Sequence, residues 1–314
     1  MLLPMPRCSV VIVTYNSATV IEGCLRALAN QDCEVVVVDN DSHDDTAARA
    51  LAMAEQMPLQ LITLPRNLGF AAGVNQGARA ASSDLLLILN PDAMAEPKAI
   101  DAILECFLSS AADAVGGALL DSDGHPAKGF AFRRLPRPTS LVFEALLINQ
   151  VWSGNPVNRR YRCLSADYLL QQQVEQPAGA CLAVTRKAFD SVQGMDATFF
   201  PVWFEDVDFC ARLHQTGARV MYCPRARFHH SGAHSVGQLE FRDRQLFWYR
   251  NMVRYARKHF SAGSVVVLRL AILVGMGLRI LAAFLPRRDL PAGQAARSYA
   301  RVAGWAIGIG GDGA

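Results

Sequence analysis

The stretch SVVIVTYN at residues 9–16 is a short, continuous apolar run that ends in polar side chains. Three similar runs follow, EVVVVDN at 34–40, LQLITL at 59–64 and DLLLILN at 84–90. Apolar runs of about four to eight residues without alternation are typical of strands buried on both faces, as in a parallel sheet. The four runs therefore predict four strands of one parallel sheet.

Helical patterns separate these runs and follow the last of them, near residues 18–30, 44–57, 69–81 and 97–109. Strand and helix thus alternate four times along the first third of the chain. This alternation predicts an α/β fold with a doubly wound, mostly parallel sheet.

Composition limits the class of protein. The 314 residues suffice for one large α/β domain or two ordinary ones. A formal net charge of +3 is too small to indicate nucleic-acid binding, so we expect no nucleic acid as a partner. The eight cysteines include no CxxC pair, which argues against a zinc site or disulfide framework and favours a reducing compartment. The N-terminus lacks the features of a signal peptide.

In an open α/β sheet, ligands bind beyond the carboxyl ends of the strands. Here those ends are polar: Thr14-Tyr15-Asn16, Asp39-Asn40, Arg66-Asn67 and Asn90-Pro91-Asp92. No GxGxxG motif follows the first strand and no P-loop motif occurs, so a nicotinamide enzyme or a P-loop NTPase is disfavoured. Taken singly these residues could be turn formers or caps, but four polar ends together favour a nucleotide site.

Three of these side chains have a clear chemical use. Asp39 could accept hydrogen bonds from a base or a ribose, and Arg66 could contact a phosphate or stack on a ring. Asp92 could hold a hard divalent ion together with substrate phosphates. These residue types favour a phosphorylated, nucleotide-like ligand.

The segment VWFEDVDF at residues 202–209 places three acids behind two large aromatics. Acids suit the first turn of a helix, where free N–H groups and the helix dipole favour negative charge. The alternative is that one of the acids is a catalytic base. For Asp208 we expect a structural role, either capping the first turn or pairing with an arginine.

Residues 121–165 contain glycines, prolines and basic residues without a clear period. We interpret this segment as a long, mobile, basic loop. Its cationic side chains could meet anionic headgroups or a polyprenyl diphosphate, or could simply be solvated. They are Arg133, Arg134, Arg137, Arg159, Arg160 and Arg162.

The most apolar segment is 264–285, after a predicted helix at 237–259. It is just long enough to span a bilayer, but Arg269 and Arg279 would each cost about 2.5–3.5 kcal/mol at mid-bilayer. We therefore expect a helix that lies in the membrane interface, with both arginines reaching lipid phosphates. A hydrophobic helix packed on the catalytic domain is the alternative.

Five motifs now stand in a characteristic order. They are SVVIVTYN, VVVVDNDSHDDT, RNLGFAAGVNQG, LLLILNPD and FFPVWFEDVDFCARLHQTG. Together they resemble the family 2 glycosyltransferases of the GT-A fold, and among them the bacterial rhamnosyltransferase-like branch. The resemblance covers about residues 9–235. It implies an inverting transferase that uses a nucleotide-diphosphate sugar and a divalent metal, Mg²⁺ or Mn²⁺.

The resemblance also implies the donor site. Its first motif, its "DN.S" acid, its "RN.GFA.G.N" loop and its metal motif would surround the nucleotide, the diphosphate and the donor sugar. The matching residues are Thr14, Tyr15, Asn16, Asp39, Arg66, Asn67, Gly69, Asn75 and Asn90.

The family's DxD metal motif falls on Asn90-Pro91-Asp92, so its first acid is an amide and Asp92 becomes the main protein ligand of the metal. The segment FHHSGAHS at 228–235 resembles a histidine segment that supplies another metal ligand in several members. The resemblance implicates His229 first and His230 second.

The catalytic residues follow from the family's "ED" motif, whose second acid is the base. That acid is Asp206 here. Glu205 and Trp203 are then expected to bind and orient the acceptor.

The predicted organisation is a GT-A catalytic domain at 1–235, with a nucleotide-binding half at 1–120 and an acceptor half at 121–235. An apolar helical extension that associates with the membrane occupies 236–314. We hypothesise transfer of a sugar, with rhamnose the first candidate, from a dTDP-, UDP- or GDP-linked donor. The acceptor would be a hydroxyl of a glycan or of a polyprenyl-diphosphate-linked glycan, in bacterial cell-surface polysaccharide synthesis.

This function places the chain in the cytoplasm, on the cytoplasmic face of the inner membrane. Two alternatives stay open. A sugar nucleotidyltransferase usually has a glycine-rich, basic loop after the first strand, which TYNSATVIEG lacks. A non-catalytic sugar- or lipid-binding scaffold is disfavoured by the Glu205-Asp206 pair and the histidines.

Overall fold

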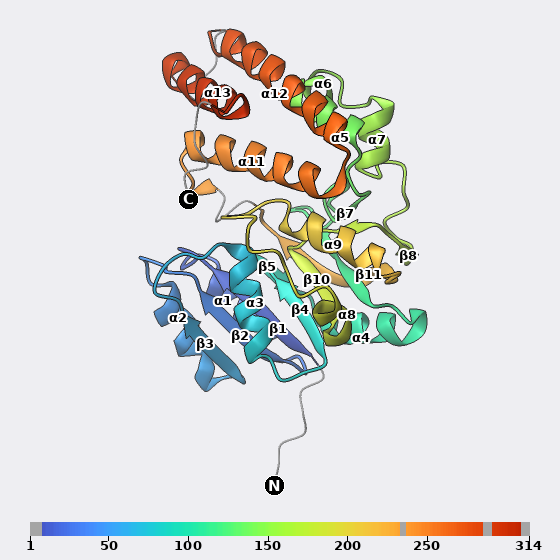
Figure 1. Cartoon of the computed structure of the whole chain (residues 1–314). Helices are drawn as coiled ribbons and strands as arrows, with labels where there is room; N and C mark the ends of the chain where they lie inside the picture. The colour runs from blue at the N-terminus through green and yellow to red at the C-terminus, as the bar shows by residue number, and fades with distance from the viewer. Residues whose placement is uncertain (1–7, 233–236, 285–290, 309–314) are drawn as a thin grey trace. The chain divides into compact units, whose positions relative to one another are not determined.

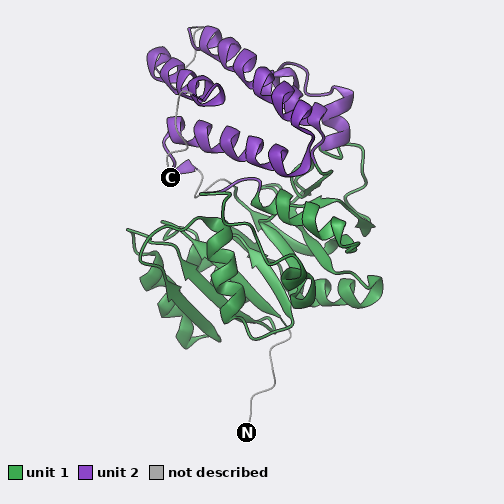
Figure 2. Cartoon of the chain, viewed as in Figure 1, with its two compact units in different colours: residues 1–135, 162–201, 205–235 green, residues 136–161, 202–204, 236–314 purple. Residues whose placement is uncertain are grey.

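The structure is a computed structural model that describes residues 8–232, 237–284 and 291–308. The chain divides into two compact units (Figure 2). Unit 1 comprises residues 1–135, 162–201 and 205–235, and unit 2 comprises residues 136–161, 202–204 and 236–314.

Unit 1 is built on one mixed sheet with the strand order β3-β2-β1-β4-β10-β6-β11-β5 (Figure 1). The strands β1 to β4 are parallel, and β10 runs antiparallel to both of its neighbours, β4 and β6. The predicted α/β class and mostly parallel sheet are confirmed. The strands are β1 (Ser9–Thr14), β2 (Glu34–Asp39), β3 (Leu59–Thr63), β4 (Leu85–Leu89), β5 (Ala93–Ala95), β6 (Ala114–Leu120), β10 (Cys181–Thr185) and β11 (Val220–His230).

The four predicted helices of this unit are present, each a few residues shorter or shifted. They are α1 (Ile21–Leu28), α2 (Thr46–Ala52, followed by the short η1, Met53–Glu55), α3 (Phe70–Ala80) and α4 (Ala99–Ser110). Two further helices are α8 (Arg186–Ser191) and α9 (Glu205–Gln215), and short strands are β7 (Phe132–Arg133), β8 (Gln172–Gln173) and β9 (Gln176–Pro177).

Helix α3 lies directly on β1 because two of its residues have no side chain. A Cβ at Gly77 would stand 2.3 Å from Val11 Cγ1, and one at Gly73 would stand 2.6 Å from Val13 Cγ1. Interiors are packed too densely to absorb such atoms. This contact fixes the start of α3, and with it the loop before it, against the carboxyl end of β1.

Unit 2 is helical. Its helices are α5 (Pro138–Ala145), α6 (Ile148–Val151), α7 (Pro156–Tyr161), α11 (Phe241–His259), α12 (Ala262–Ala283) and α13 (Ala292–Ala306). The predicted extension at 236–314 therefore forms only part of this unit. Residue 285 of the predicted apolar segment lies outside the described residues.

The interpretation of 121–165 as an irregular loop is wrong, because α5, α6 and α7 lie within it. Pro138 begins α5 with the fixed φ that suits a first turn, and Leu141 and Ala145 are buried. These helices are short and lack a polar face long enough to produce a clear period, so tertiary packing rather than local pattern defines them.

The expected orientation of the α12 arginines is also wrong. Arg279 is 8% exposed, and its guanidinium donates to the carbonyl oxygens of Ala145 at 2.7 Å and Gly275 at 3.1 Å. Arg269 lies over the Trp305 ring, 5.7 Å from its centroid. Both cations are thus directed at groups of unit 2. By length and composition alone, α12 could cross a membrane.

We predict that Gly275→Ala destabilises unit 2. A Cβ at Gly275 would stand 1.9 Å from the Ala145 carbonyl oxygen, so α12 would have to move away from α5. Overpacking of this kind costs about 1–3 kcal/mol, which is measurable as a lower thermal or urea midpoint. The matched control is Gly277→Ala on the same helix, where a Cβ meets nothing within 4 Å. That variant should be neutral or more stable by up to about 1 kcal/mol, and equal midpoints for the two variants would contradict this account.

Candidate active site

The carboxyl ends of β1 and β2 form a hydrogen-bonded cluster. Their parallel register pairs Thr14 with Asp39, and Thr14 Oγ1 donates to Asp39 Oδ1 at 3.0 Å. The same carboxylate accepts from the Ser42 hydroxyl at 2.5 Å and from the Ser42 amide at 3.2 Å. These bonds fix the orientation of Asp39, which is only 4% exposed. A fixed acceptor at a strand end suits recognition of a base or ribose.

Asn16 continues the cluster. Its φ of +46° is in the left-handed region, which asparagine tolerates better than most residues. Its amide N–H donates to Ser42 Oγ at 2.9 Å, and its Oδ1 accepts from the His43 amide at 2.7 Å. Tyr15 beside it is partly exposed. The structure thus brings the first predicted donor motif together with Asp39.

The loop before α3 is fixed by two asparagines. Asn40 Nδ2 donates to Asn67 Oδ1 at 3.0 Å, and Asn67 Oδ1 also accepts from the Gly69 amide at 2.9 Å. Gly69 has φ +85°, which disfavours any side chain, and a Cβ there would stand 3.1 Å from the Pro201 carbonyl oxygen. Arg66 is exposed. A charged side chain on a fixed loop at this sheet edge can reach a phosphate without rearranging the backbone.

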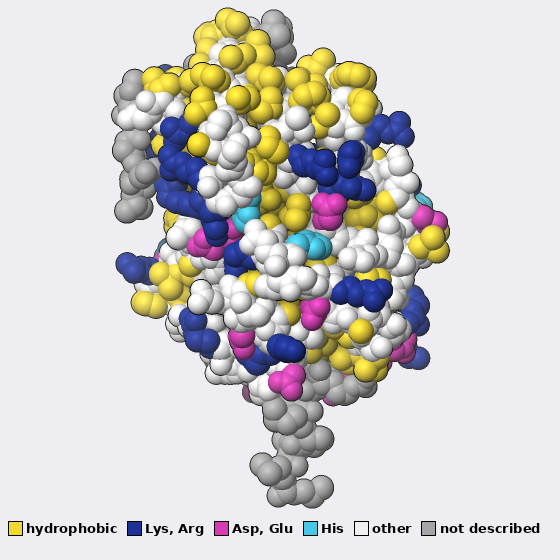
Figure 3. Space-filling model, turned by 45° about the vertical axis from the view of Figure 1, so that its right-hand side comes forward, with side chains coloured by type: hydrophobic (Ala, Val, Ile, Leu, Met, Phe, Trp, Pro, Cys, Tyr) yellow, Lys and Arg dark blue, Asp and Glu magenta, His cyan; other side chains and the backbone are white. Residues whose placement is uncertain are grey.

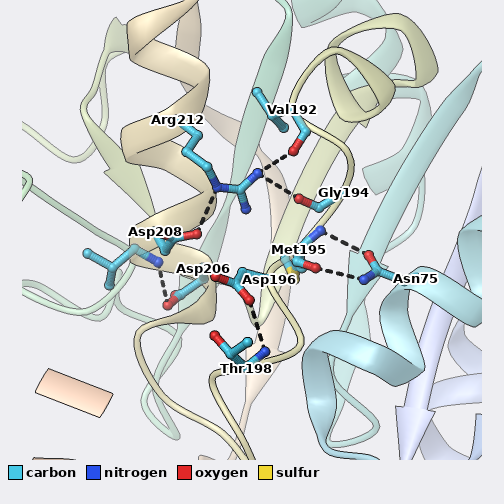
Figure 4. A network of polar contacts seen from close by, with 10 residues as sticks. Asn75, Val192, Gly194, Met195, Asp196, Thr198, Asp206, Asp208 and Arg212 are labelled. Atoms are coloured by element: carbon cyan, nitrogen blue, oxygen red, sulfur yellow. Dashed lines mark hydrogen bonds and ion pairs between the residues drawn. The ribbon is translucent and has the colours of Figure 1, made fainter. Parts of the chain in front are cut away.

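The Asn75 side chain bonds to the backbone of the loop after α8. Its Nδ2 donates to the Met195 carbonyl oxygen at 2.7 Å, and its Oδ1 accepts from the Met195 amide at 2.9 Å (Figure 4). Both amide atoms therefore hold the loop after α8 against α3. This geometry favours a structural role for Asn75, and donor binding by it stays a prediction.

The predicted metal ligands lie where β4 and β11 end. His230 Nε2 stands 3.3 Å from Asp92 Oδ1, with both side chains nearly buried. Asn90 Nδ2 lies 3.4 Å from the same imidazole nitrogen, and the Phe130 ring stacks on His230. His229 instead contacts Glu96 Oε1 at 2.8 Å. The geometry therefore favours His230 over His229, the reverse of the order expected from the sequence, and the role of either stays a prediction.

The donor atoms fit a hard or borderline divalent ion. A carboxylate oxygen suits Mg²⁺ or Mn²⁺, and the softer imidazole nitrogen favours Mn²⁺ of the two. The separation of 3.3 Å between Asp92 Oδ1 and His230 Nε2 allows both to contact one ion. Among the described residues, no group of three or more His, Cys, Asp and Glu side chains could hold a metal. Magnesium-type sites commonly use one or two protein ligands and complete their shell with water and substrate phosphates.

We predict that His230→Ala lowers Mn²⁺-dependent binding of a nucleotide diphosphate by at least about tenfold, because it removes one of two ligands. Calorimetric titration with and without Mn²⁺ measures this effect. His229→Ala is the matched control, since it removes the neighbouring imidazole and should leave the metal dependence unchanged. Equal losses in the two variants would contradict the assignment to His230.

Asp206 lies in the first turn of α9, within a set of N–H donors. Its Oδ2 accepts from the Gly179 amide at 2.9 Å and from Gln176 Nε2 at 3.1 Å, and its Oδ1 accepts from the Val207 amide at 2.8 Å. A Cβ at Gly179 would stand 2.9 Å from Asp206 Cβ, so only glycine allows this approach. The residue as a whole keeps some exposed surface, and its carboxylate is held in one orientation.

Two opposing effects act on the pKa of Asp206. Burial raises it, while the hydrogen bonds from Gly179 and Val207 and the charge of Arg133 act to lower it, with a net upward shift. A carboxylate with a raised pKa is a stronger base than an ordinary aspartate. The arrangement is therefore suited to proton abstraction.

Glu205 is 4% exposed. Burial first, and then the neighbouring Asp206 carboxylate, raise the pKa of Glu205 well above its ordinary value. Within the described part of the chain, Glu205 Oε2 has no hydrogen-bond partner. A buried carboxyl in this setting holds its proton to higher pH than an ordinary glutamate.

We predict that Glu205→Gln changes the pH dependence of stability. A raised folded-state pKa gives a stabilising contribution that is present at low pH and is lost as pH rises through that pKa. The amide does not titrate, so the thermal midpoint of the variant should rise relative to wild type as pH increases above the ordinary titration range of a glutamate. The exposed Glu55→Gln is measured alongside as the control for the loss of one carboxylate. A constant difference for Glu205→Gln would contradict a protonated Glu205.

The structural role expected for Asp208 is confirmed. Asp208 is fully buried and pairs with Arg212 Nε at 2.8 Å, one helical turn later (Figure 4). Arg212 also donates to the carbonyl oxygens of Val192 and Gly194. Trp203, predicted to bind the acceptor, belongs to unit 2, where its ring contacts Trp248 with 5.6 Å between centroids.

Sequence reasoning missed the groups that hold the predicted base. Gln176 and Gly179 lie 30 and 27 positions before Asp206, and no local pattern connects them to it. Ser42 could have been found, because a serine two positions after an aspartate-asparagine pair is placed to bond back to that aspartate.

Comparison with known proteins shows the family of this chain. Residues 9–189, more than half of the chain, match the model of glycosyl transferase family 2, and residues 159–234 match the N-terminal domain of galactosyltransferase. A relative from Mycobacterium tuberculosis, N-acetylglucosaminyl-diphospho-decaprenol L-rhamnosyltransferase, is 29% identical over 86% of this chain and 94% of its own. The dolichol-phosphate mannosyltransferase of Pyrococcus furiosus is 29% identical over 35% of this chain and 32% of its own.

Solved structures share the fold at low identity. A mannosyltransferase of Pyrobaculum calidifontis, in complex with GDP-Man and Mn²⁺, has a TM-score of 0.55 and 17% identity, covering 97% of this chain and 86% of that one. S. aureus TarS in complex with UDP-GlcNAc has a TM-score of 0.54 and 15% identity, covering 96% and 92%. These neighbours are GT-A glycosyltransferases, and this chain has the GT-A fold.

Proposed function

Because the chain belongs to glycosyl transferase family 2 and is a glycosyltransferase, we propose that it transfers a sugar from a nucleotide-diphosphate donor to a lipid-linked glycan, with Asp206 as the base. The observation that carries this proposal is the setting of Asp206. Its carboxylate is oriented by three N–H donors and keeps a raised pKa. It belongs to the same unit as the polar strand ends that are predicted to bind the donor.

The proposed mechanism is an in-line displacement at the anomeric carbon. Asp206 removes the proton from the acceptor hydroxyl as the oxygen attacks, and the diphosphate leaves on the opposite side. Asp39 and Asn16 hold the nucleoside end, and Arg66 meets the diphosphate. Asp92 and His230 would hold a divalent ion, which would supply Lewis-acid stabilisation of the charge on the leaving phosphate when bound.

The substrates are proposed by analogy. The mycobacterial relative is named for transfer of L-rhamnose to an N-acetylglucosaminyl-diphospho-decaprenol acceptor, and it matches almost the whole chain. We therefore infer a rhamnose donor, dTDP-linked in the first instance, and a polyprenyl-diphosphate-linked acceptor sugar. A screen of dTDP-, UDP- and GDP-sugars with Mn²⁺ by thermal shift tests the donor, because a ligand that binds the native state raises its stability.

We predict that Asp206→Asn abolishes transfer and preserves donor binding. The amide retains the shape of the side chain but cannot accept a proton, and general-base catalysis contributes about 10²- to 10⁴-fold in rate. Single-turnover kinetics and donor calorimetry measure the two properties. Asp190→Asn, an exposed change in the same unit, is the control and should retain full turnover. Wild-type turnover in Asp206→Asn would exclude Asp206 as the base.

The acceptor proposal places the protein at the cytoplasmic surface of a bacterial membrane. Support comes from the exposed apolar face of α12, which includes Val267, Leu270, Val274 and Leu281, each more than half exposed. Such a face is typical of a helix that inserts shallowly into a bilayer.

We predict that the protein floats with vesicles containing phosphatidylglycerol and that Leu270→Glu together with Leu281→Glu reduces the bound fraction. Charges on this face would have to be desolvated on insertion. Leu108→Glu is the matched control, because Leu108 is 84% exposed but lies on α4 of unit 1. If wild type stays with the soluble fraction, the membrane part of the proposal is wrong.

A further inference from the structure

Unit 2 contains a cavity of about 680 Å³ that the proposed mechanism does not use. All of its lining residues belong to unit 2, from helices α5, α6, α11, α12 and α13 and from Trp203. A volume of this size is typical of a site for a ligand of drug size or larger. The aromatic and cationic side chains of the lining are Trp203, Arg244, Trp248, Tyr249, Arg279 and Tyr299.

The polar part of the cavity is cationic. Arg244 is partly exposed and its guanidinium lies over the Phe241 ring, 5.6 Å from the centroid. Arg279 is fixed by its bonds to backbone carbonyl oxygens and lies over the Tyr249 ring at 5.6 Å. One acid, Glu144, lines the cavity and accepts from Asn149 Nδ2 at 3.0 Å. Two guanidinium groups against one carboxylate favour an anion, and arginine is well suited to phosphate.

Apart from Gln150 and Gln245, the rest of the lining is aromatic or aliphatic, and it continues onto exposed apolar surface. Val151 and Ala282 line the cavity, and Val151 is itself 88% exposed. Beside Ala282 along α12, Leu281 is 71% exposed and Leu278 is 44% exposed. Figure 3 shows hydrophobic side chains gathered over this helical part of the chain. A ligand with a phosphate in the cavity can therefore extend a hydrocarbon chain toward these exposed apolar side chains.

We propose that this cavity binds the phosphate-bearing end of an isoprenoid lipid, the carrier of the acceptor sugar. The inference rests on the proposed function and names the site for the carrier. Arg244 meets the phosphate, and the aromatic rings of Trp248, Tyr249 and Tyr299 pack against the first branched isoprene units. A sugar or nucleotide alone would leave the apolar rim exposed. Trp203, one wall of the cavity, precedes the proposed base by three residues in the sequence.

The test measures binding of decaprenyl phosphate to the full chain in detergent micelles by calorimetry. Ala282→Trp places a large ring in the cavity and Arg244→Glu reverses its charge, so each should weaken binding at least tenfold. Arg297→Glu is the control for charge reversal, because Arg297 is exposed on α13 and does not line the cavity. Thermal unfolding verifies that each variant is folded. We expect Arg244→Glu to fold because the Arg244 side chain is partly exposed to solvent.

Kinetics give a second measurement. Ala282→Trp and Arg244→Glu should raise KM for the polyprenyl-linked acceptor at least tenfold and leave the KM for the nucleotide-sugar donor unchanged. Unchanged lipid affinity in both variants would overturn the proposal. Equal affinity of the cavity for phosphatidylglycerol would overturn the isoprenoid assignment, since the site would then be one for anionic lipids in general.

The experiments distinguish failure of the lipid site from failure of the proposed sugar transfer. If decaprenyl phosphate binds and the cavity variants weaken it, but no donor is consumed, the lipid site stands and the proposed transfer fails. If the protein transfers sugar to the lipid-linked acceptor with wild-type KM in both variants, the transfer stands and the lipid site is wrong.

Discussion

The parallel pairing of β1 with β2 and β4 is the constraint on which unit 1 depends. Parallel neighbours place their carboxyl ends at one edge of the sheet, so the register that pairs Thr14 with Asp39 also gathers the polar residues after each strand. The antiparallel β10, inserted between β4 and β6, extends the same sheet to β11, whose end carries His230. Asp92 and His230, 138 positions apart in the sequence, thus meet at this edge.

Two kinds of rigidity act at this edge. Backbone close approach holds α3 on β1 through Gly73 and Gly77. Side-chain amides and guanidinium groups then hold the loops, as Asn67, Asn75 and Arg212 do. Because these groups are bonded to backbone atoms, the loops at this edge are held without a ligand, and in the proposed mechanism this order would lower the entropy lost when a transition state forms.

The strands and helices of the first 110 residues could be predicted because their signals are local: apolar runs, alternation with helical periods and polar ends. The family motifs gave the candidate base and metal ligands. Positions set by distant packing could not be predicted in this way. The register of β11 against β5 turns His230 toward Asp92 and His229 toward Glu96. The residues next to the two histidines in the sequence give no signal for this register. The same holds for Arg279, whose partners lie more than 130 residues earlier.

Unit 2 is assembled from three separate stretches, at 136–161, 202–204 and 236–314. The chain therefore passes between the units five times, and the helical unit is not a contiguous C-terminal domain. Phe204, buried against the rings of Trp248 and Tyr255, is joined directly to Glu205. A protein shortened at residue 235 would lose both of those rings and the helix that covers α5, leaving an unpartnered aromatic next to the proposed base. The helical unit and the start of α9 are thus joined by the single peptide bond between Phe204 and Glu205.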